Sequence, residues 1–141
     1  MKNLSVRAGG ESDAGELFPI VVELATSFAP ERSSFERAFR RILADRDACL
    51  LVAELDGSVI GYLLGFDHLT FFANGPVSWV EEIAVASPLR RNGVGRALMT
   101  RFEGWAASRG SRLVALATRR AGEFYSALGY DESASYFRKV L

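Results

Sequence analysis

One stretch decides the fold of this chain: Ser87-Pro88-Leu89-Arg90-Arg91-Asn92-Gly93-Val94-Gly95-Arg96-Ala97-Leu98-Met99. It comes directly after an apolar segment, residues 79–86, that is expected to form a strand, and it leads into a predicted helix. Glycine has no Cβ and lets a backbone approach a ligand closely, while the free N–H groups at a helix N-terminus attract negative charge. Three arginines in the stretch add positive charge. The stretch therefore predicts a binding site for a phosphate-bearing ligand.

Two common phosphate-binding motifs are excluded by the residues that follow the glycines. A P-loop requires a lysine and then a serine or threonine after its second glycine, and neither follows Gly95. A dinucleotide-binding fingerprint requires a third glycine, and Leu98 occupies its position. The pattern that remains is Arg-x-x-Gly-x-Gly.

The loop and two further segments resemble the GNAT superfamily of acyl-CoA-dependent N-acyltransferases. Val80-Glu81-Glu82-Ile83-Ala84-Val85 is similar to the central strand of that family, and the glycine loop is similar to its pyrophosphate loop. Phe124-Tyr125-Ser126-Ala127-Leu128-Gly129-Tyr130 is similar to its closing helix. The resemblance implies an α/β fold with a mixed, mostly antiparallel sheet flanked by four helices. It also implies a single N-acetyltransferase domain over residues 1–141.

This resemblance implies that the donor is acetyl-CoA. The backbone of residues 83–85 is expected to pair with the pantetheine arm, and a free N–H there could stabilise the oxyanion of the reaction. The N–H groups of residues 91–96 are expected to hold the pyrophosphate, with Gly93 and Gly95 at positions where no side chain fits. The residues expected to bind coenzyme A are Ile83, Ala84, Val85, Arg90, Arg91, Asn92, Gly93, Val94, Gly95, Arg96, Ala97, Thr118, Phe124 and Tyr125.

Thr118 departs from the family pattern. The family often has an asparagine at this position, seven residues before the tyrosine, where it contacts the pantetheine. A threonine can still donate or accept a hydrogen bond there. Arg119 and Arg120 follow it, and they either reach the phosphates of coenzyme A or are simply solvated.

The candidate catalytic residues are Glu81, Glu82 and Tyr125. A primary amine must be neutral to attack, and on the order of one in a thousand is neutral at pH 7, so a carboxylate base is useful. Because successive strand residues point to opposite faces, at most one glutamate faces the thioester. The register of related enzymes favours Glu81, although both glutamates could instead form salt bridges. By resemblance, Tyr125 protonates the leaving thiolate; the alternative is a packed interior aromatic.

Composition limits the kinds of protein that this chain can be. It has 141 residues, with 17 basic and 17 acidic side chains, which fits one globular domain without an overall attraction to nucleic acid. Cys49 is the only cysteine and His68 the only histidine, so neither a disulfide nor a metal site is expected. No signal peptide or membrane-spanning run is visible, so we expect a cytoplasmic protein without a membrane partner.

The rest of the chain predicts a series of short elements. Strands are expected at residues 4–8, 48–55, 58–66, 78–86 and 113–117, the last of these buried on both faces, with one or two more in 132–141. Asp56-Gly57 predicts a hairpin turn between the second and third strands. Capping boxes predict helices that begin at Asp13/Glu16, ending at Pro30, and at Ser33/Glu36. Two more helices are expected to end at Gly110 and Gly129.

Three functions remain open from sequence. The first is an enzyme that acetylates a small-molecule amine or amino acid by direct attack in a ternary complex, with the acceptor in an aromatic pocket. The second is a non-catalytic acyl-CoA-binding regulatory module, and the third is an interaction subunit that uses an exposed Phe71-Phe72 loop. A homodimer is possible. The residues expected around the acceptor are Tyr62, His68, Phe71, Phe72 and Trp79.

Overall fold

Five strands form one mixed sheet in the computed structural model, which describes residues 3–141. The strands are β1 (Leu4–Ala8), β2 (Ala48–Leu55), β3 (Ser58–Leu69), β4 (Pro76–Val85) and β5 (Val114–Ala115). The α-helices are α1 (Ala14–Leu24), α2 (Arg32–Ala44), α3 (Val94–Ser108) and α4 (Gly122–Ala127). Two short 3₁₀ helices, η1 (Glu11–Asp13) and η2 (Ser87–Leu89), precede α1 and α3.

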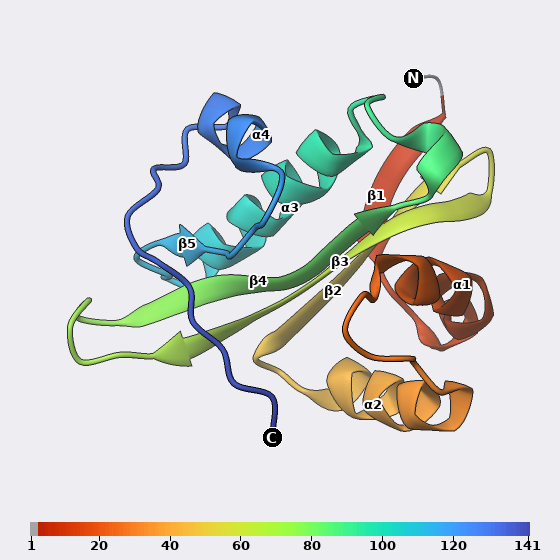
Figure 1. Cartoon of the computed structure of the whole chain (residues 1–141), viewed down its shortest axis with the longest axis horizontal. Helices are drawn as coiled ribbons and strands as arrows, with labels where there is room; N and C mark the ends of the chain where they lie inside the picture. The colour runs from red at the N-terminus through yellow and green to blue at the C-terminus, as the bar shows by residue number, and fades with distance from the viewer. Residues whose placement is uncertain (1–2) are drawn as a thin grey trace.

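The helices cover both faces of the sheet. The strand order is β1-β2-β3-β4-β5, and every neighbouring pair is antiparallel except β4 and β5, which are parallel. α1 and α2 lie on one face and α3 and α4 on the other (Figure 1). Each face has its own apolar core, one around Leu17, Val52 and Tyr62 and the other around Leu98 and Phe102. The described residues confirm the predicted sheet with its four helices.

The β2–β3 hairpin forms at the predicted turn. Asp56 and Gly57 both have positive φ angles, 51° and 83°, as a two-residue hairpin turn that matches the twist of the strands requires. Leu55 and Ser58 then face each other as the first pair of the ladder. β3 extends beyond the predicted boundary and ends at Leu69.

A β-bulge interrupts the pairing of β3 with β4. Leu64 opposes Glu82, but the next residue of β3, Gly65, opposes Val80, so Glu81 is an extra residue in β4. A Cβ atom at Gly65 would lie 2.8 Å from the carbonyl oxygen of Trp79 and would overlap the ring of Phe102. A glycine at this position therefore lets α3 pack directly on the sheet beside the bulge.

The predicted capping box of α1 is wrong, because both of its carboxylates have other partners. Asp13 accepts hydrogen bonds of 2.8 Å from each terminal nitrogen of Arg7, and one of 2.7 Å from the backbone N–H of Gly10. The bond from Arg7 contributes most to lowering the pKa of Asp13. Glu16 accepts from the backbone N–H of Val59 on β3. These two acids join the N-terminal segment to the sheet.

The ends of the first two helices also differ from expectation. α1 ends at Leu24 and not at Pro30, because residues 25–31 form an irregular connection. α2 begins at Arg32, so Ser33 lies inside its first turn. The N-cap residue is Glu31, whose carboxylate accepts a hydrogen bond from the hydroxyl of Ser34.

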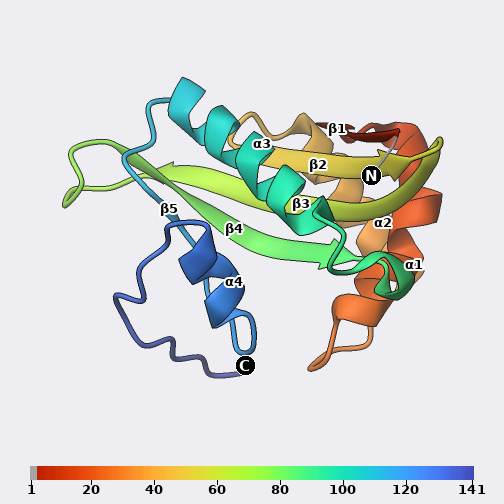
Figure 2. The same ribbon diagram turned by 90° about the horizontal axis from the view of Figure 1, so that it is seen from above.

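The C-terminal part of the chain contains less sheet than predicted. Only Val114 and Ala115 form β5, and they are half-buried, whereas a strand buried on both faces was expected over residues 113–117. Residues 130–141 contain no strand, so the predicted final strands are wrong for this structure. This segment lies exposed along the side of the sheet where β4 and β5 are found (Figure 2).

Replacement of Gly65 by alanine tests the packing at the bulge. We expect Gly65→Ala to lower the free energy of unfolding by about 1–3 kcal/mol, because the new methyl group must displace the buried Phe102 ring or the β4 backbone. Chemical denaturation measures the change. Gly104→Ala in α3 is the matched control, since a Cβ there meets nothing within 4 Å and alanine favours a helix. An unchanged stability for Gly65→Ala would contradict the close packing.

Candidate functional site

The outer edge of β4 is unpaired over most of its length. β5 pairs with β4 only at Ser78 and Trp79. β5 consists of the two residues that pair there, and beyond them no other described strand lies on that side of β4 (Figure 1). The C-terminal half of β4 therefore presents backbone groups along an open edge.

Strand alternation shows which backbone groups point to this open side. The N–H of Ala86 donates to the carbonyl of Ile60, so Ala86 pairs toward β3. In an antiparallel ladder the backbone groups of successive residues point to alternate sides. Ala84 therefore also points toward β3, while the N–H and C=O groups of Ile83 and Val85 point to the open side. Of the three residues expected to pair with a ligand, only Ile83 and Val85 have this orientation.

The loop after β4 turns sharply into α3. Arg91 and Gly93 both have positive φ angles, 66° and 83°, and Gly93 is the N-cap of the helix. A positive φ in a non-glycine residue such as Arg91 is uncommon and costs energy, so it indicates a constrained site. Because Gly93 has no side chain, no side-chain cap covers the first N–H groups of α3. These groups and the helix dipole favour negative charge at this end of α3, which is the candidate anion site.

The two glycines of the loop serve different purposes. At Gly93 a Cβ would meet nothing within 4 Å, so glycine is favoured there by the positive φ. At Gly95 a Cβ would lie 3.3 Å from Cζ of Phe124, the nearest neighbour from α4. Within the protein itself, a side chain at Gly93 is therefore disfavoured by backbone conformation, and one at Gly95 by the limited room beside Phe124. That the ligand leaves no room for a side chain at either position stays a prediction.

The three arginines of the loop do not all point toward the anion site. Arg90 pairs with Glu23 of α1 at 2.9 Å. Arg96 lines a shallow groove along α3 that also includes Val6 of β1. Arg91 is exposed, and neither it nor Arg96 has an ion-pair partner among residues 3–141.

The bulge lies at the two candidate bases. Glu82 opposes Leu64, and Glu81 is the extra residue before it, so regular strand alternation does not apply between the two glutamates. That at most one of them faces the thioester stays a prediction. Glu81 is exposed and Glu82 is half-buried. The hydroxyl of Tyr62 donates to Glu82 at 2.7 Å. Burial, and then the negative charge of Glu82, raise the pKa of Tyr62 far above its ordinary value.

Tyr125 lies in the core on the α3 side of the sheet. Its ring packs edge-on against Phe124 and Tyr130, and Ile83 and Val85 pack against the same core cluster. Its hydroxyl makes no hydrogen bond to any residue that the structure describes. Burial raises the pKa of Tyr125, so the hydroxyl remains protonated at neutral pH. It is therefore available as a proton donor to a ligand.

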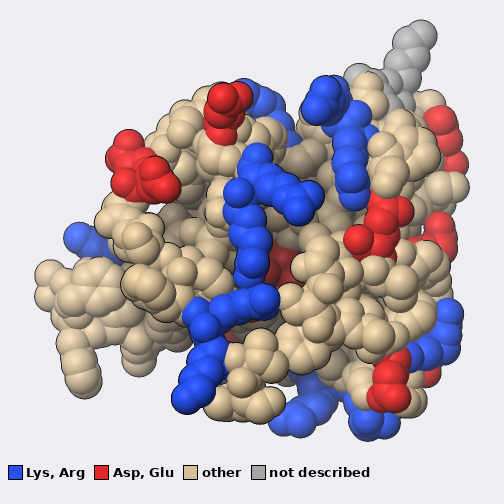
Figure 3. All heavy atoms as spheres, viewed as in Figure 1, with Lys and Arg blue, Asp and Glu red and all other residues tan. Residues whose placement is uncertain are grey.

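The segment between β5 and α4 contributes Thr118 and two arginines to the open side. The hydroxyl oxygen of Thr118 accepts a hydrogen bond from the N–H of Ala121 and so stabilises the approach to α4. Arg119 and Arg120 are exposed. Figure 3 shows basic side chains gathered in a band across the middle of this face, beside a hollow in which acidic atoms are visible. On this face, positively charged side chains therefore lie at the surface and acidic atoms lie within the hollow.

The predicted aromatic pocket does not form. Tyr62 is buried beneath α1 and α2, where it bonds Glu82. Phe71 and Phe72 lie in the exposed β3–β4 connection, and His68 is exposed near the end of β3. The expected residues are therefore separated between the core and the tip of a hairpin.

Two parts of the site were missed at the sequence level. Tyr62 was considered only as a pocket aromatic, because its position opposite Ala84 and its contact with Glu82 depend on the bulge that shifts the β3–β4 register. Glu23, which contacts Ser87 and Arg90, carries no sequence signal, because more than sixty residues separate it from them. Such a contact depends on how α1 packs against β4.

Within residues 3–141, no group of three or more His, Cys, Asp or Glu side chains is arranged to hold a metal ion. None of the described helices is both long and apolar enough to cross a membrane.

The sequence matches the acetyltransferase (GNAT) family over residues 17–130. Most of the chain is included in this match, so the chain belongs to the GNAT acetyltransferase family. Among proteins with curated descriptions, none matches the sequence.

Solved structures share the fold at low sequence identity. Glucosamine-6-phosphate N-acetyltransferase from Arabidopsis thaliana has a TM-score of 0.87 at 20% identity, covering 99% of both chains. A transcriptional regulator from Bacillus halodurans C-125 has a TM-score of 0.87 at 22% identity, covering 98% of this chain and 99% of that one. AAC(6')-Iy, solved with the bisubstrate analogue CoA-S-monomethyl-acetylneamine, has a TM-score of 0.82 at 22% identity, covering 98% and 99%. At these identities the similarity establishes the fold alone.

Proposed function

We propose that this protein transfers an acetyl group from acetyl-CoA to the primary amine of a small molecule or amino acid. The transfer is by direct attack in a ternary complex, and residues 1–141 act as one N-acetyltransferase domain. One observation carries the proposal: the unpaired edge of β4 leads directly into the anion site at the start of α3. An extended arm that ends in phosphates fits this combination.

The donor would be held by backbone groups. The N–H groups at the start of α3 would bind the pyrophosphate of acetyl-CoA, and Arg91 would add charge beside it. The open-side groups of Ile83 and Val85 would pair with the pantetheine arm in the manner of an added strand. The limited space at Gly95 supports a close approach between the loop and its ligand. The same fold was solved with a CoA-containing analogue in AAC(6')-Iy, which supports this choice of donor.

Three side chains would carry the proton transfers. Glu81, exposed at the bulge, would accept the proton of the acceptor amine, directly or through water. Glu82 is the second candidate, and its bond from Tyr62 fixes one of its oxygens. Tyr125, protonated and without a bonded partner among the described residues, would donate its proton to the departing thiolate. An N–H of Ile83 or Val85 would stabilise charge on the thioester oxygen.

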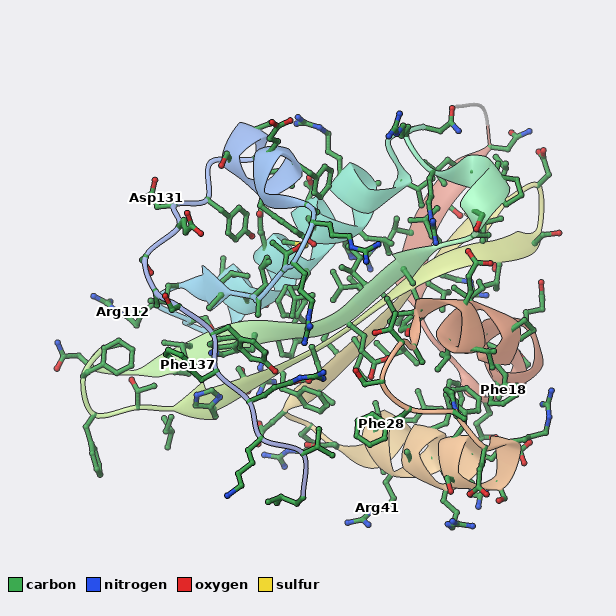
Figure 4. All side chains as sticks on the ribbon, in the orientation of Figure 1. Phe18, Phe28, Arg41, Arg112, Asp131 and Phe137 are labelled. Carbon is green, nitrogen blue, oxygen red and sulfur yellow. The ribbon has the colours of Figure 1, made fainter. Side chains whose placement is uncertain are left out.

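The acceptor would enter between the α1–α2 connection and the C-terminal segment. Arg138 of that segment donates a hydrogen bond of 3.0 Å to the hydroxyl of Ser27 in the connection. Phe28 and Phe137 are both exposed, and each is next in sequence to one residue of this contact; Figure 4 labels both rings. They offer apolar contact to a small amine.

Homodimerisation and a cytoplasmic location are also part of the proposal.

Thiol release from acetyl-CoA tests the proposed function. With a panel of small amines and amino acids, we expect release that depends on at least one amine. Gly95→Val is the binding control: its side chain would crowd Phe124 and the ligand path, so its affinity for acetyl-CoA should fall at least tenfold by calorimetry. Binding without amine-dependent release would instead favour a non-catalytic acyl-CoA-binding module. Unchanged affinity in Gly95→Val would remove the loop assignment.

Tyr125→Phe tests the proposed proton donor. It removes only the hydroxyl, so the ring can keep its packing in the core. We expect kcat to fall about a hundredfold, the usual scale for a general acid, with little change in the affinity for acetyl-CoA. An unchanged kcat would reduce Tyr125 to a packing role.

The pH dependence of kcat/KM distinguishes the two glutamates. A base works only when deprotonated, so activity should fall as the pH is lowered and the carboxylate gains a proton. Glu81→Gln should lower kcat/KM and move the acidic limb to higher pH, where the ionisation of the amine alone sets it, whereas Glu82→Gln should keep the limb of the unsubstituted enzyme. If the limb moves only in Glu82→Gln, the base is Glu82. If it moves in neither variant, neither glutamate is the base.

A further inference from the structure

Glu23 links the last turn of α1 to the loop that precedes α3. One of its carboxylate oxygens, Oε1, accepts hydrogen bonds from the backbone N–H of Ser87 at 3.2 Å and from the Ser87 hydroxyl. The same oxygen accepts from Nη2 of Arg90 at 2.9 Å. A single carboxylate therefore connects the helix layer on the acceptor side with the start of the proposed donor loop.

Arg90 has a second contact, on the open edge of β4. Its Nε donates a hydrogen bond of 3.2 Å to the carbonyl oxygen of Val85. The backbone groups of Val85 point away from β3, toward the open edge of β4. The Arg90 side chain thus occupies the C-terminal end of the unpaired edge, where strand-like pairing with a ligand would finish.

We propose that Glu23 and Arg90 form a latch over the Val85 carbonyl that acetyl-CoA must open. This inference rests on the proposed function, because it assigns the open edge to the pantetheine arm. On binding, Arg90 leaves Val85 and Glu23, and its guanidinium becomes free to pair with a phosphate of the ligand. Glu23 is then a positioning residue, which holds Arg90 on the edge in the free protein and acts on the ligand only through it.

The exposure of the pair suits a reversible latch. The side chains of Arg90 and Glu23 retain 56% and 43% of their accessible surface. An ion pair this exposed is weak, so a ligand with several negative charges can displace it. Guanidinium groups bind phosphate in two-pronged geometry, which gives Arg90 a better partner in the complex than in the free protein.

Acetyl-CoA affinity in a double-mutant cycle tests the latch. Glu23→Gln weakens the hold on Arg90 but keeps an oxygen that can accept from Ser87. We expect this variant to bind acetyl-CoA about two- to fivefold more tightly, the range that an exposed ion pair can supply. In an Arg90→Ala background the same change should have no effect, because the latch is already absent.

Controls separate the latch from simpler explanations. Removing a negative charge near a polyanion could tighten binding by itself, but that gain would persist in the Arg90→Ala background and would overturn the inference. Glu11→Gln removes an exposed charge of η1 that has no hydrogen bond within the described chain, and Ser87→Ala removes the hydroxyl that donates to Glu23 while keeping the backbone N–H of that residue. Neither should tighten binding.

The outcomes distinguish this inference from the proposed function. If the unsubstituted chain binds no acetyl-CoA, the proposed function fails and the latch fails with it. If that chain binds acetyl-CoA but Glu23→Gln binds equally or more weakly, only the latch is overturned. Tighter binding that requires Arg90 supports the latch.

Discussion

The packing of Phe102 against Gly65 is the constraint on which the rest of the site depends. The ring belongs to α3, is fully buried, and occupies the space that any side chain at Gly65 would need. The contact holds α3 against the sheet beside the bulge, where Glu81 is inserted into β4. Bulges bend a strand and increase its twist, which accounts for β4 leaving β5 after Trp79. The contact between Phe102 and Gly65 thus fixes the position of α3 relative to the open edge of β4 and to the two glutamates at the bulge.

The site can be understood as two adjacent backbone features. The open edge of β4 offers the N–H and C=O groups of Ile83 and Val85, of which the Val85 carbonyl accepts from Arg90, and the start of α3 offers uncapped N–H groups. Under the proposed function these backbone groups would hold the donor, and side chains would add the proton chemistry. Tyr125, whose pKa burial raises, would then stand on one side and the two glutamates at the bulge on the other.

Much of the fold follows from local sequence, and the exceptions have physical reasons. Asp56-Gly57 and the cap at Gly110 were predictable because a positive φ is a local requirement. The cap at Asp13 failed because Arg7, a residue of β1, competes for its carboxylate. The bulge at Glu81 and the contacts of Glu23 could not be predicted, because both arise from the packing of segments distant in sequence. The strands expected in residues 132–141 do not form, because local alternation specifies a strand only where one face is buried, and every residue of this segment is exposed.

Amide hydrogen exchange at three adjacent residues of β4 tests the central claim that the open edge receives acetyl-CoA. In the free protein the N–H of Ala84, which points toward β3, should exchange slowly, and those of Ile83 and Val85 should exchange quickly. Addition of acetyl-CoA should protect Ile83 and Val85 and leave Ala84 as it was. Fast exchange at Ile83 and Val85 that persists at saturating acetyl-CoA would contradict the account.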